Sequence, residues 1–236
     1  MGWTEAAKRR AAEKAVDHVG SGSVVGLGSG STAAHATQIL GIRLRSGELR
    51  DILGVPTSLQ AAAEAVRAGV PLTTLDEYPK PDMAIDGADQ VDGELNAIKG
   101  GGGALLREKV VAAASRLYII VADSTKLTAR LGEGCPLPVE VLPFALRPVL
   151  CKIGELGAEV EVRLGGGKLG PVVTDNGNLI VDADFGAIPK PRRLEAELKT
   201  IPGIIETGLF LGYADVAYLG TEDGVRRLER KRRDAI

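Results

Sequence analysis

The first half of the chain repeats one order of local structure: a short β-rich run, a loop and a helical pattern. This order occurs in SVVGLGSGSTAAHATQIL, then from DILGV to LQAAAEAVRAG, then from MAIDGAD to ALLREKVVAAASR, and LYIIVADS closes the series. Apolar strands that alternate with helices are typical of a parallel sheet covered on both faces. We therefore predict an α/β fold with an open, parallel, Rossmann-like sheet, and we expect ligands at the carboxyl ends of its strands.

The pattern changes after Pro136. AEVEVRL alternates polar and apolar residues, and Asn176-Gly177 lies between two β-rich runs, as the turn of a β-hairpin does. With helical patterns over residues 144–157 and 191–200, this part is predicted to be a smaller α+β domain, ferredoxin-like, inserted near the C-terminus. GYADVAYLG is then the strand that returns to the first sheet. The predicted boundaries are 1–134 with 210–236 for the α/β domain and 135–209 for the small α+β domain.

Composition limits the classes of partner. The 236 residues are 44% hydrophobic, and 29 basic against 31 acidic residues give a net charge of -2. This balance provides no overall field for nucleic acid or an anionic membrane, so we expect small molecules or further copies of the chain as partners. Cys135 and Cys151 lack both metal-ligand spacing and the density of a secreted disulfide scaffold. The N-terminal segment reads as an amphipathic helix opened by Thr4 rather than as a signal peptide, and we expect a cytoplasmic protein.

The glycine-rich turn GLGSGST at residues 26–32 fits neither common nucleotide-binding motif. A dinucleotide fingerprint needs a glycine where this chain has Ser31, and a P-loop needs a lysine that the turn lacks. What remains is a helix N-terminus with hydroxyl groups and free backbone N–H groups, which suits one phosphate monoester. A tight turn capped by a serine is the alternative.

Asp86 and Asp89 stand at the end of a predicted apolar strand, separated by Gly87 and Ala88, which are small enough to let a ligand come close. Such a pair can bind a metal ion, cap a helix or accept hydrogen bonds from sugar hydroxyls. The metal is the weakest interpretation, because neither histidine is near the pair in sequence and hard cations usually gather more oxygen ligands. We therefore predict no metal site and interpret both carboxylates as hydrogen-bond acceptors for a polyol.

The stretch KGGGGALLREK begins with Lys99 and carries Glu108 on a predicted helix. Its four glycines lose much backbone entropy on folding, so we expect them to permit an unusual backbone or a close approach. The residues three and four positions away from Glu108 are apolar, so this carboxylate projects from an apolar face. It is then either paired with a cation such as Arg107 or Lys109, or held at the raised pKa that a general base needs.

Together these features suit proton abstraction beside the carbonyl of a sugar phosphate. They also resemble one known family. GLGSGSTA, VPTS, AIDGAD, IKGGGGALLREK, ADSTK, PLPVEV, VTDNGN and IPGIIETGLF occur in the order and spacing of ribose-5-phosphate isomerases of type A. The resemblance implies interconversion of D-ribose 5-phosphate and D-ribulose 5-phosphate in the non-oxidative pentose phosphate pathway, without metal or organic cofactor. It also implies a homodimer or homotetramer.

By matching motif, the resemblance implies three catalytic residues. Glu108 is the base that moves a proton between C2 and C1 through a cis-enediol. Lys99, with backbone N–H groups of the glycine loop, stabilises the enediolate oxygen, and Asp86 assists opening of the furanose ring. The implied substrate-binding residues are Ser29, Gly30, Ser31, Thr32, Asp86, Gly87, Ala88, Asp89, Lys99, Gly100, Gly101, Gly102 and Lys126.

Three features depart from the family pattern. Ser29 stands where many relatives carry threonine, and Gln90 and Asp92 stand where glutamate and asparagine are common. The tail from Gly224 to Ile236 holds RRLERKRR, and we predict a solvated, partly helical end rather than a nucleic-acid site.

Two other classes of function remain open. A sugar-phosphate sensor would share the phosphate site, although no spare segment can form a helix-turn-helix. A coenzyme A transferase-like enzyme would use Glu108 as a nucleophile.

Overall fold

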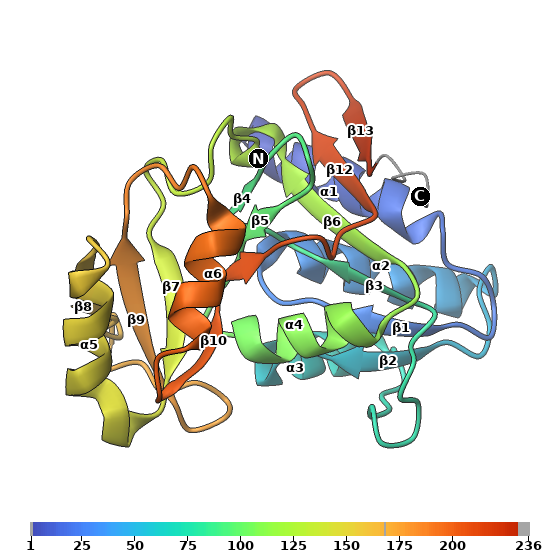
Figure 1. Ribbon diagram of the computed structural model, residues 1–236. Coiled ribbons are helices and arrows are strands. Elements are labelled where there is room, and N and C mark those ends of the chain that lie inside the picture. Colours follow the sequence, from blue (N-terminus) through green and yellow to red (C-terminus); the bar gives the residue numbers. More distant parts are fainter. Residues whose placement is uncertain (1, 168, 231–236) are drawn as a thin grey trace, which may run out of the picture.

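The computed structural model describes residues 2–167 and 169–230, and its largest element is a six-stranded sheet (Figure 1). The strand order is β13-β12-β6-β3-β1-β2, and all strands except the edge strand β13 run parallel. Strands β1, β3, β6 and β12 are buried along their whole length, as expected of apolar runs covered on both faces. The strand bounds are β1 Val24–Leu27, β2 Leu53–Pro56, β3 Met83–Asp86, β6 Tyr118–Asp123, β12 Val216–Gly220 and β13 Val225–Glu229.

Helices cover the two faces of this sheet and bury different side chains of the same strands. On β6, Ile119 and Val121 belong to the core beneath α1, α2 and α3, whereas Tyr118 and Ile120 belong to the core beneath α4. This alternation is the period of two that a strand imposes on its side chains. The helix bounds are α1 Trp3–Val16, α2 Ser31–Ser46, α3 Leu59–Ala68 and α4 Leu105–Ala114.

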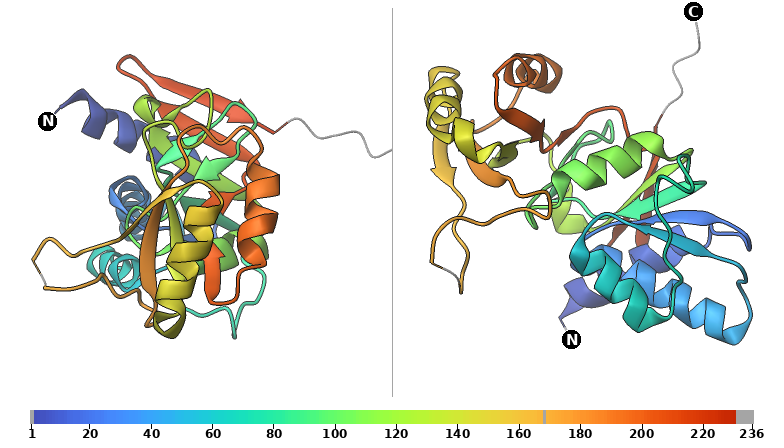
Figure 2. Two further views of the ribbon diagram at one scale, coloured as in Figure 1. Left: turned by 60° about the vertical axis from the view of Figure 1, so that its left-hand side comes forward. Right: turned by 90° about the horizontal axis from the view of Figure 1, so that it is seen from below.

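A second, four-stranded sheet lies to one side of the first (Figure 2). Its order is β10-β7-β9-β8, all neighbours are antiparallel, and α5 and α6 pack on it around a separate apolar core. A small sheet of order β11-β5-β4 lies between the two, and two short 3₁₀ turns complete the described chain. The bounds are β7 Leu137–Val141, α5 Leu146–Glu155, β8 Glu159–Val162, β9 Leu179–Asp184, α6 Pro191–Lys199, β10 Ile204–Thr207, β4 Gln90–Val91, β5 Ala97–Ile98, β11 Leu209–Phe210, η1 Ser124–Lys126 and η2 Pro143–Ala145.

The predicted parallel sheet and the return of GYADVAYLG as β12 are confirmed, and two local predictions are wrong. Helix α1 begins at Trp3 with Gly2 as its uncapped N-cap residue, so Thr4 lies inside the helix and does not open it. The tail is not helical over residues 225–229, because this segment pairs antiparallel with β12 as an edge strand of the main sheet. Residues 231–236 lie outside the described part of the chain.

Within the described residues, none of the helices combines the length and the apolar character needed to cross a membrane.

The packing of α1 on β12 generates a stability prediction at Gly220. A Cβ atom at this position would lie 2.0 Å from the backbone oxygen of Ala7, so Gly220→Ala must push α1 away from the sheet. We expect a loss of about 1–3 kcal/mol in the free energy of unfolding, as overpacking usually costs, measured by urea denaturation. Gly224→Ala is the matched control, because no heavy atom lies within 4 Å of its Cβ position. Equal stability of the two variants would contradict the close packing.

Candidate functional site

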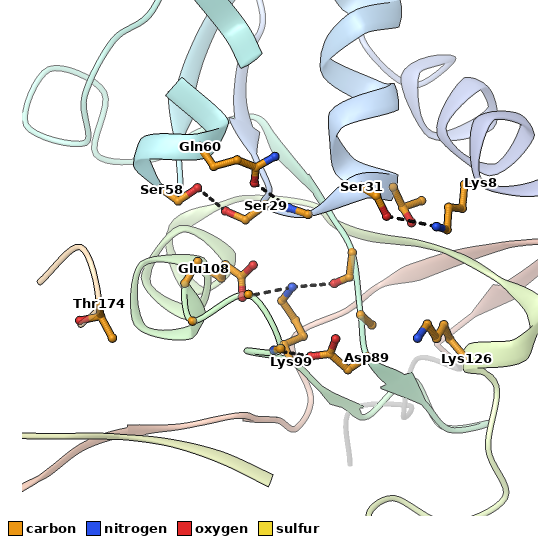
Figure 3. Close-up of a pocket in the computed structure, with 18 of the residues that line it drawn as sticks. Lys8, Ser29, Ser31, Ser58, Gln60, Asp89, Lys99, Glu108, Lys126 and Thr174 are labelled. Atoms are coloured by element: carbon orange, nitrogen blue, oxygen red, sulfur yellow. Dashed lines mark hydrogen bonds and ion pairs between the residues drawn. The ribbon is translucent and has the colours of Figure 1, made fainter. Parts of the chain in front are cut away.

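A pocket of about 460 Å³ opens at the carboxyl ends of β1, β2, β3 and β6 (Figure 3). This is the edge at which open parallel sheets bind their ligands, and the volume suits a small molecule. The pocket is lined by Thr4, Lys8, Ser29, Gly30, Ser31, Thr32, Ser58, Gln60, Gly87, Ala88, Asp89, Lys99, Gly101, Gly102, Gly103, Ala104, Glu108, Asp123, Thr125, Lys126, Val172, Val173, Thr174 and Asp175.

One end of the pocket is the N-terminus of α2. No side chain caps this helix, so its first N–H groups are available for an anion. Lys8 Nζ, from α1, donates to Ser31 Oγ at 3.2 Å and places a positive charge beside that helix end. Figure 3 shows Lys126 on the same side of the pocket and Thr174 on the opposite side. This end is therefore suited to a phosphate group.

The loop before α2 is held by side chains from α3 and from the connection between β2 and α3. Ser29 Oγ makes hydrogen bonds to Thr57 Oγ1 at 2.9 Å and to Ser58 Oγ at 2.6 Å. Gly30 N donates to Gln60 Oε1 at 3.0 Å. The Ser29 hydroxyl thus shapes the loop, and threonine, the family's more common residue, would keep that hydroxyl.

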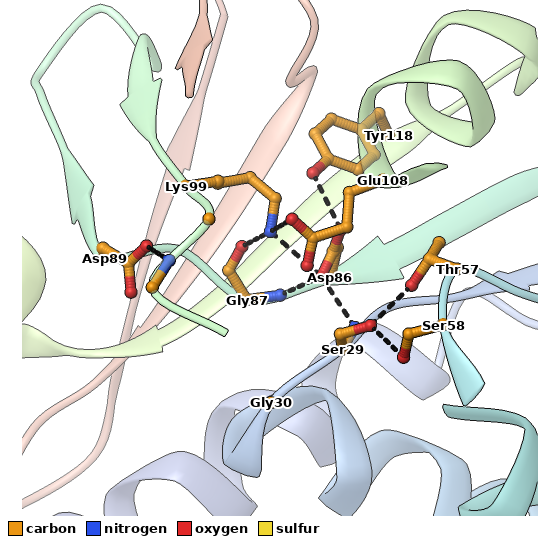
Figure 4. A network of polar contacts seen from close by, with 12 residues as sticks. Ser29, Gly30, Thr57, Ser58, Asp86, Gly87, Asp89, Lys99, Glu108 and Tyr118 are labelled. Carbon is orange, nitrogen blue, oxygen red and sulfur yellow. Dashed lines mark hydrogen bonds and ion pairs between the residues drawn. The ribbon is translucent and has the colours of Figure 1, made fainter. Parts of the chain in front are cut away.

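Asp86 ends strand β3 and lies buried beneath the pocket, with 1% of its surface exposed (Figure 4). Its carboxylate accepts hydrogen bonds from Gly87 N at 2.7 Å and Ser29 N at 3.2 Å. Tyr118, which burial keeps protonated by raising its pKa well above the usual value, donates from its hydroxyl at 3.3 Å. The side chain of Asp86 is therefore held in one position at the floor of the site.

Lys99 is buried between two carboxylates. Its Nζ lies 3.1 Å from Asp86 Oδ1 and 3.3 Å from Glu108 Oε2, and donates to the Gly87 carbonyl at 2.6 Å. Burial alone would lower the pKa of Lys99, but the charges of Asp86 and Glu108 outweigh it and raise the pKa. Lys99 therefore stays charged and gives the pocket a fixed cation next to Glu108.

Glu108 comes from the first turn of α4 and is 4% exposed. Burial, followed by the charge of Asp86, raises the pKa of Glu108 from 4.5 to about 8, although Lys99 opposes the shift. Burial also raises the pKa of Asp86, against Lys99 and the Gly87 and Ser29 N–H groups. One cation thus serves two buried carboxylates, and Glu108 can gain or lose a proton near neutrality.

The glycine run forms the wall next to Lys99, and three of its four members need to be glycine. Gly100 and Gly103 have φ values of +106° and +77°. Gly101 N donates to Asp89 Oδ2 at 2.7 Å, and a Cβ atom on Gly101 would lie 2.6 Å from that carboxylate's Oδ1. Gly102 has open space around its Cβ position, so the predicted requirement does not apply there.

The opposite wall comes from the second sheet. The turn before β9 brings Val172, Val173, Thr174 and Asp175 to the pocket. Asp175 Oδ2 accepts a hydrogen bond from Leu59 N, at the start of α3, at 2.7 Å. The expected turn at Asn176-Gly177 is present, since Gly177 N donates to the Thr174 carbonyl at 2.9 Å. The turn therefore closes the pocket from the far side.

Most of the predicted site residues meet in this pocket. Asp86 and Gly100 do not line it: Asp86 lies behind Lys99, and Gly100 is buried beneath the loop. The alternative pairing of Glu108 with Arg107 or Lys109 is wrong, because Lys99 is its ion-pair partner. Sequence reasoning missed mainly Lys8, Gln60, Asp123, Thr174 and Asp175. The family motifs ADSTK and VTDNGN contain Asp123 and the pair Thr174 and Asp175, so they could have indicated these three residues. No motif contains Lys8.

The departures at Gln90 and Asp92 have structural roles. Gln90 accepts from Gly132 N at 2.8 Å and donates to the Glu133 carbonyl at 2.7 Å. Asp92 accepts from the backbone N–H groups of Glu94 and Asn96. Neither residue lines the pocket, so the departures do not alter the site.

In the part of the chain that the structure describes, His, Cys, Asp and Glu side chains form no group of three or more that could hold a metal ion. The chemistry that the pocket's own residues offer is proton transfer by Glu108 beside the Lys99 ammonium, on a ligand with an anionic group at the α2 end.

Comparisons with known proteins point to one family. A family model described as ribose 5-phosphate isomerase A (phosphoriboisomerase A) matches residues 53–224. The ribose-5-phosphate isomerase A of Thermosynechococcus vestitus is 53% identical over 213 residues, which are 90% of each chain. A solved D-ribose-5-phosphate isomerase in complex with phospho-erythronic acid is 44% identical, with a TM-score of 0.94 over 96% of this chain and 99% of that chain. Ribose 5-phosphate isomerase A of Methanocaldococcus jannaschii is also 44% identical, with a TM-score of 0.91 over 95% of this chain and 99% of that chain.

The raised pKa of Glu108 generates a prediction about stability. The folded protein holds this proton up to about pH 8, whereas the usual value is 4.5, so the folded state binds more protons between these values. The wild type should therefore lose stability relative to Glu108→Gln as pH rises through this window, by up to about 1.4 kcal/mol per pH unit. Urea unfolding of both proteins from about pH 5 to about pH 9 measures the difference. Parallel curves would mean that Glu108 titrates normally.

Proposed function

The chain belongs to the ribose 5-phosphate isomerase A family, and we infer that it interconverts D-ribose 5-phosphate and D-ribulose 5-phosphate. The observation that carries the assignment to this pocket is the buried group of Glu108, Lys99 and Asp86 beside an uncapped helix N-terminus. An aldose–ketose isomerisation needs a base near neutrality, a donor for an oxyanion and a phosphate site, and this pocket offers all three.

We propose that the 5-phosphate lies at the N-terminus of α2. Ser31 and Thr32 line that end of the pocket, together with Lys8 and Lys126. The ligand of one solved relative, phospho-erythronic acid, is itself a phosphorylated sugar acid, which supports a sugar phosphate as the ligand here. Gly87, Ala88 and Asp89 then face the sugar carbons, with Asp89 accepting from a hydroxyl group.

In the proposed reaction, Glu108 removes the proton from C2 of the open-chain aldose and the C1 carbonyl oxygen gains negative charge. The enediol that results has lost the C2–H bond and carries a C1–C2 double bond. Glu108 then returns the proton to C1 while the proton of the C2 hydroxyl passes to the C1 oxygen, which leaves the ketose with a C2 carbonyl and a C1 hydroxyl group. A pKa raised to about 8 makes Glu108 a much stronger base than an exposed glutamate, and its burial keeps water away.

Lys99 is the proposed donor for the enediolate oxygen, since its charged Nζ lies 3.3 Å from the Glu108 carboxylate. Gly101 and Gly103 N–H groups already donate within the protein, so we propose Gly102 N–H as the contribution of the glycine loop. Asp86 lies behind Lys99 and has no edge on the pocket. We therefore assign to Asp86 chiefly the orientation of the ammonium group, and assistance in ring opening is a secondary proposal that its raised pKa supports.

We also propose that residues 135–209 form a separate inserted domain of ferredoxin-like topology. The element order β7-α5-β8-β9-α6-β10 and the strand order β10-β7-β9-β8 support this proposal. A homodimer or homotetramer is the proposed assembly, and two exposed apolar residues close together in the sequence of that region, Leu142 and Phe144, support an interface there.

The role of Glu108 is tested by Glu108→Gln, which removes the base and keeps the shape. Turnover should fall by about 10²- to 10⁴-fold, the usual contribution of a general base, with substrate affinity nearly unchanged. Conversion of ribose 5-phosphate in deuterated water, followed by NMR, measures ketose formation and deuterium at C1. The EDTA-treated wild type should form ribulose 5-phosphate with some deuterium at C1.

Other outcomes separate the alternatives. Tight binding of ribose 5-phosphate by the wild type without conversion would favour a sensor. A covalent thioester trapped on Glu108 would favour a transferase, and full activity of Glu108→Gln would remove this residue from the mechanism.

The phosphate site is tested at Lys8, which the sequence did not reveal. Lys8→Met removes the charge that lies 3.2 Å from Ser31 Oγ, so KM should rise by about tenfold or more while kcat changes little. Lys14→Met is the matched control, because Lys14 lies on the same helix, pairs only with Asp17 among the described residues, and does not line the pocket. A loss confined to kcat in Lys8→Met would contradict the phosphate assignment.

A further inference from the structure

The carboxylate of Glu108 is poorly anchored by its own contacts. Its Oε2 atom is buried and accepts no hydrogen bond from the described residues, and its nearest cation is Lys99 Nζ at 3.3 Å. A side chain held this weakly takes its position from the backbone that carries it. Whatever fixes helix α4 therefore fixes Glu108.

The start of α4 offers little support. The N-cap residue Ala104 makes no side-chain cap, and the residues before it are the four glycines of the loop. Glu108 lies only one turn beyond this uncapped helix start. A helix end without a cap, next to a glycine run, needs contacts from elsewhere to hold its register.

Arg107, the residue before Glu108, binds the turn that forms the far wall of the pocket. Its Nε donates to Asn176 Oδ1 at 2.8 Å, and its Nη2 donates to the Asp175 carbonyl at 2.9 Å. The Asp175 carboxylate in turn accepts from Leu59 N. The turn and the first turn of α4 are thus fastened to each other across the pocket.

Lys109, the residue after Glu108, binds side chains of α6 and β10. It is 4% exposed, and its Nζ lies 3.0 Å from Glu206 Oε1 and 3.2 Å from Glu195 Oε1. The ammonium also lies 5.1 Å from the centre of the Phe210 ring, and the same ring is 5.5 Å from Lys99 Nζ. Lys109 therefore links α4 to α6 and β10 through partly buried charge pairs.

We propose that Arg107 and Lys109 are positioning residues that hold the Glu108 side chain in place. Through them, the region of β7–β10, residues 137–207, contributes to catalysis. Successive helix residues are rotated by about 100°, so these two side chains leave α4 on either side of Glu108. A buried ion pair adds little net stability compared with apolar residues, which is consistent with a role for Lys109 in geometry. The inference rests on the proposed role of Glu108.

The test compares Arg107→Met and Lys109→Met with the wild type. Each variant should lower kcat by at least about tenfold with KM changed less than about twofold, because a small displacement of the base slows proton transfer without altering the phosphate site. The kinetic isotope effect with C2-deuterated ribose 5-phosphate should increase, because the proton transfer becomes more rate-limiting. A residue that only stabilises the fold would lower the thermal midpoint and leave both quantities unchanged in the folded protein.

Lys199→Met is the matched control. Lys199 pairs with the other oxygen of the same Glu206, at 3.1 Å, but it belongs to α6 and not to α4. Its loss should leave kcat and the isotope effect at wild-type values. A drop in kcat equal to that of Lys109→Met would overturn the proposal, because the effect would then come from Glu206 and not from α4.

A second measurement covers failure of Lys109→Met to fold. Arg107 is only partly buried, so Arg107→Met should fold, and combining it with Asn176→Ala should lower kcat no further than Arg107→Met alone. Wild-type kcat in Arg107→Met would overturn the proposal for Arg107. Glu108→Gln is measured in parallel: if it is inactive while Arg107→Met and Lys109→Met are fully active, only this inference fails, whereas an active Glu108→Gln removes the proposed base itself.

Discussion

The buried ammonium of Lys99 is the interaction on which the site depends. It lies between the carboxylates of Asp86 and Glu108, and all three side chains are almost wholly excluded from solvent. Burial raises the pKa of Glu108, and the charge of Asp86 adds to the shift because one positive charge cannot fully neutralise two buried negative charges. A mechanism that needs a strong carboxylate base near neutrality therefore arises from burial together with a charge imbalance that the fold maintains.

The fold maintains this imbalance by dividing the three groups among separate elements. Asp86 ends a central strand, Lys99 follows a short strand of the intermediate sheet, and Glu108 belongs to a helix on one face of the main sheet. Of the three groups, Asp86 alone accepts hydrogen bonds from backbone N–H groups, so its carboxylate is held in one position. The buried Oε2 atom of Glu108 accepts no such hydrogen bond from the described residues, so Glu108 can gain or lose a proton without breaking one.

Local patterns in the sequence predict the parallel sheet and most of the pocket, because strand, loop and helix follow one another within short stretches. The carboxyl-end loops at Ser29, Asp89 and Lys126 are such stretches, and they meet as the sheet topology requires. Contacts between distant segments were not predictable in this way. Lys8 reaches the pocket only because α1 packs beside α2, and Asp86 meets Lys99 only because β3 lies close to the end of β5 in the folded chain. The strand at residues 225–229 was misread because its pairing partner, and not its own composition, decides its structure.

The same distinction explains why the residues on either side of Glu108 looked interchangeable in the sequence. Arg107 and Lys109 were candidates to pair with Glu108, since they are its nearest cations along the chain. A helix directs neighbouring side chains about 100° apart, so residues adjacent in sequence face different surroundings. Each of these two cations instead reaches a partner more than sixty residues away, in the region of β7–β10. The ion-pair partner of Glu108 is therefore Lys99, which is nine positions earlier in the chain but adjacent in space. Charge pairing in this site is thus decided by the directions that α4 imposes.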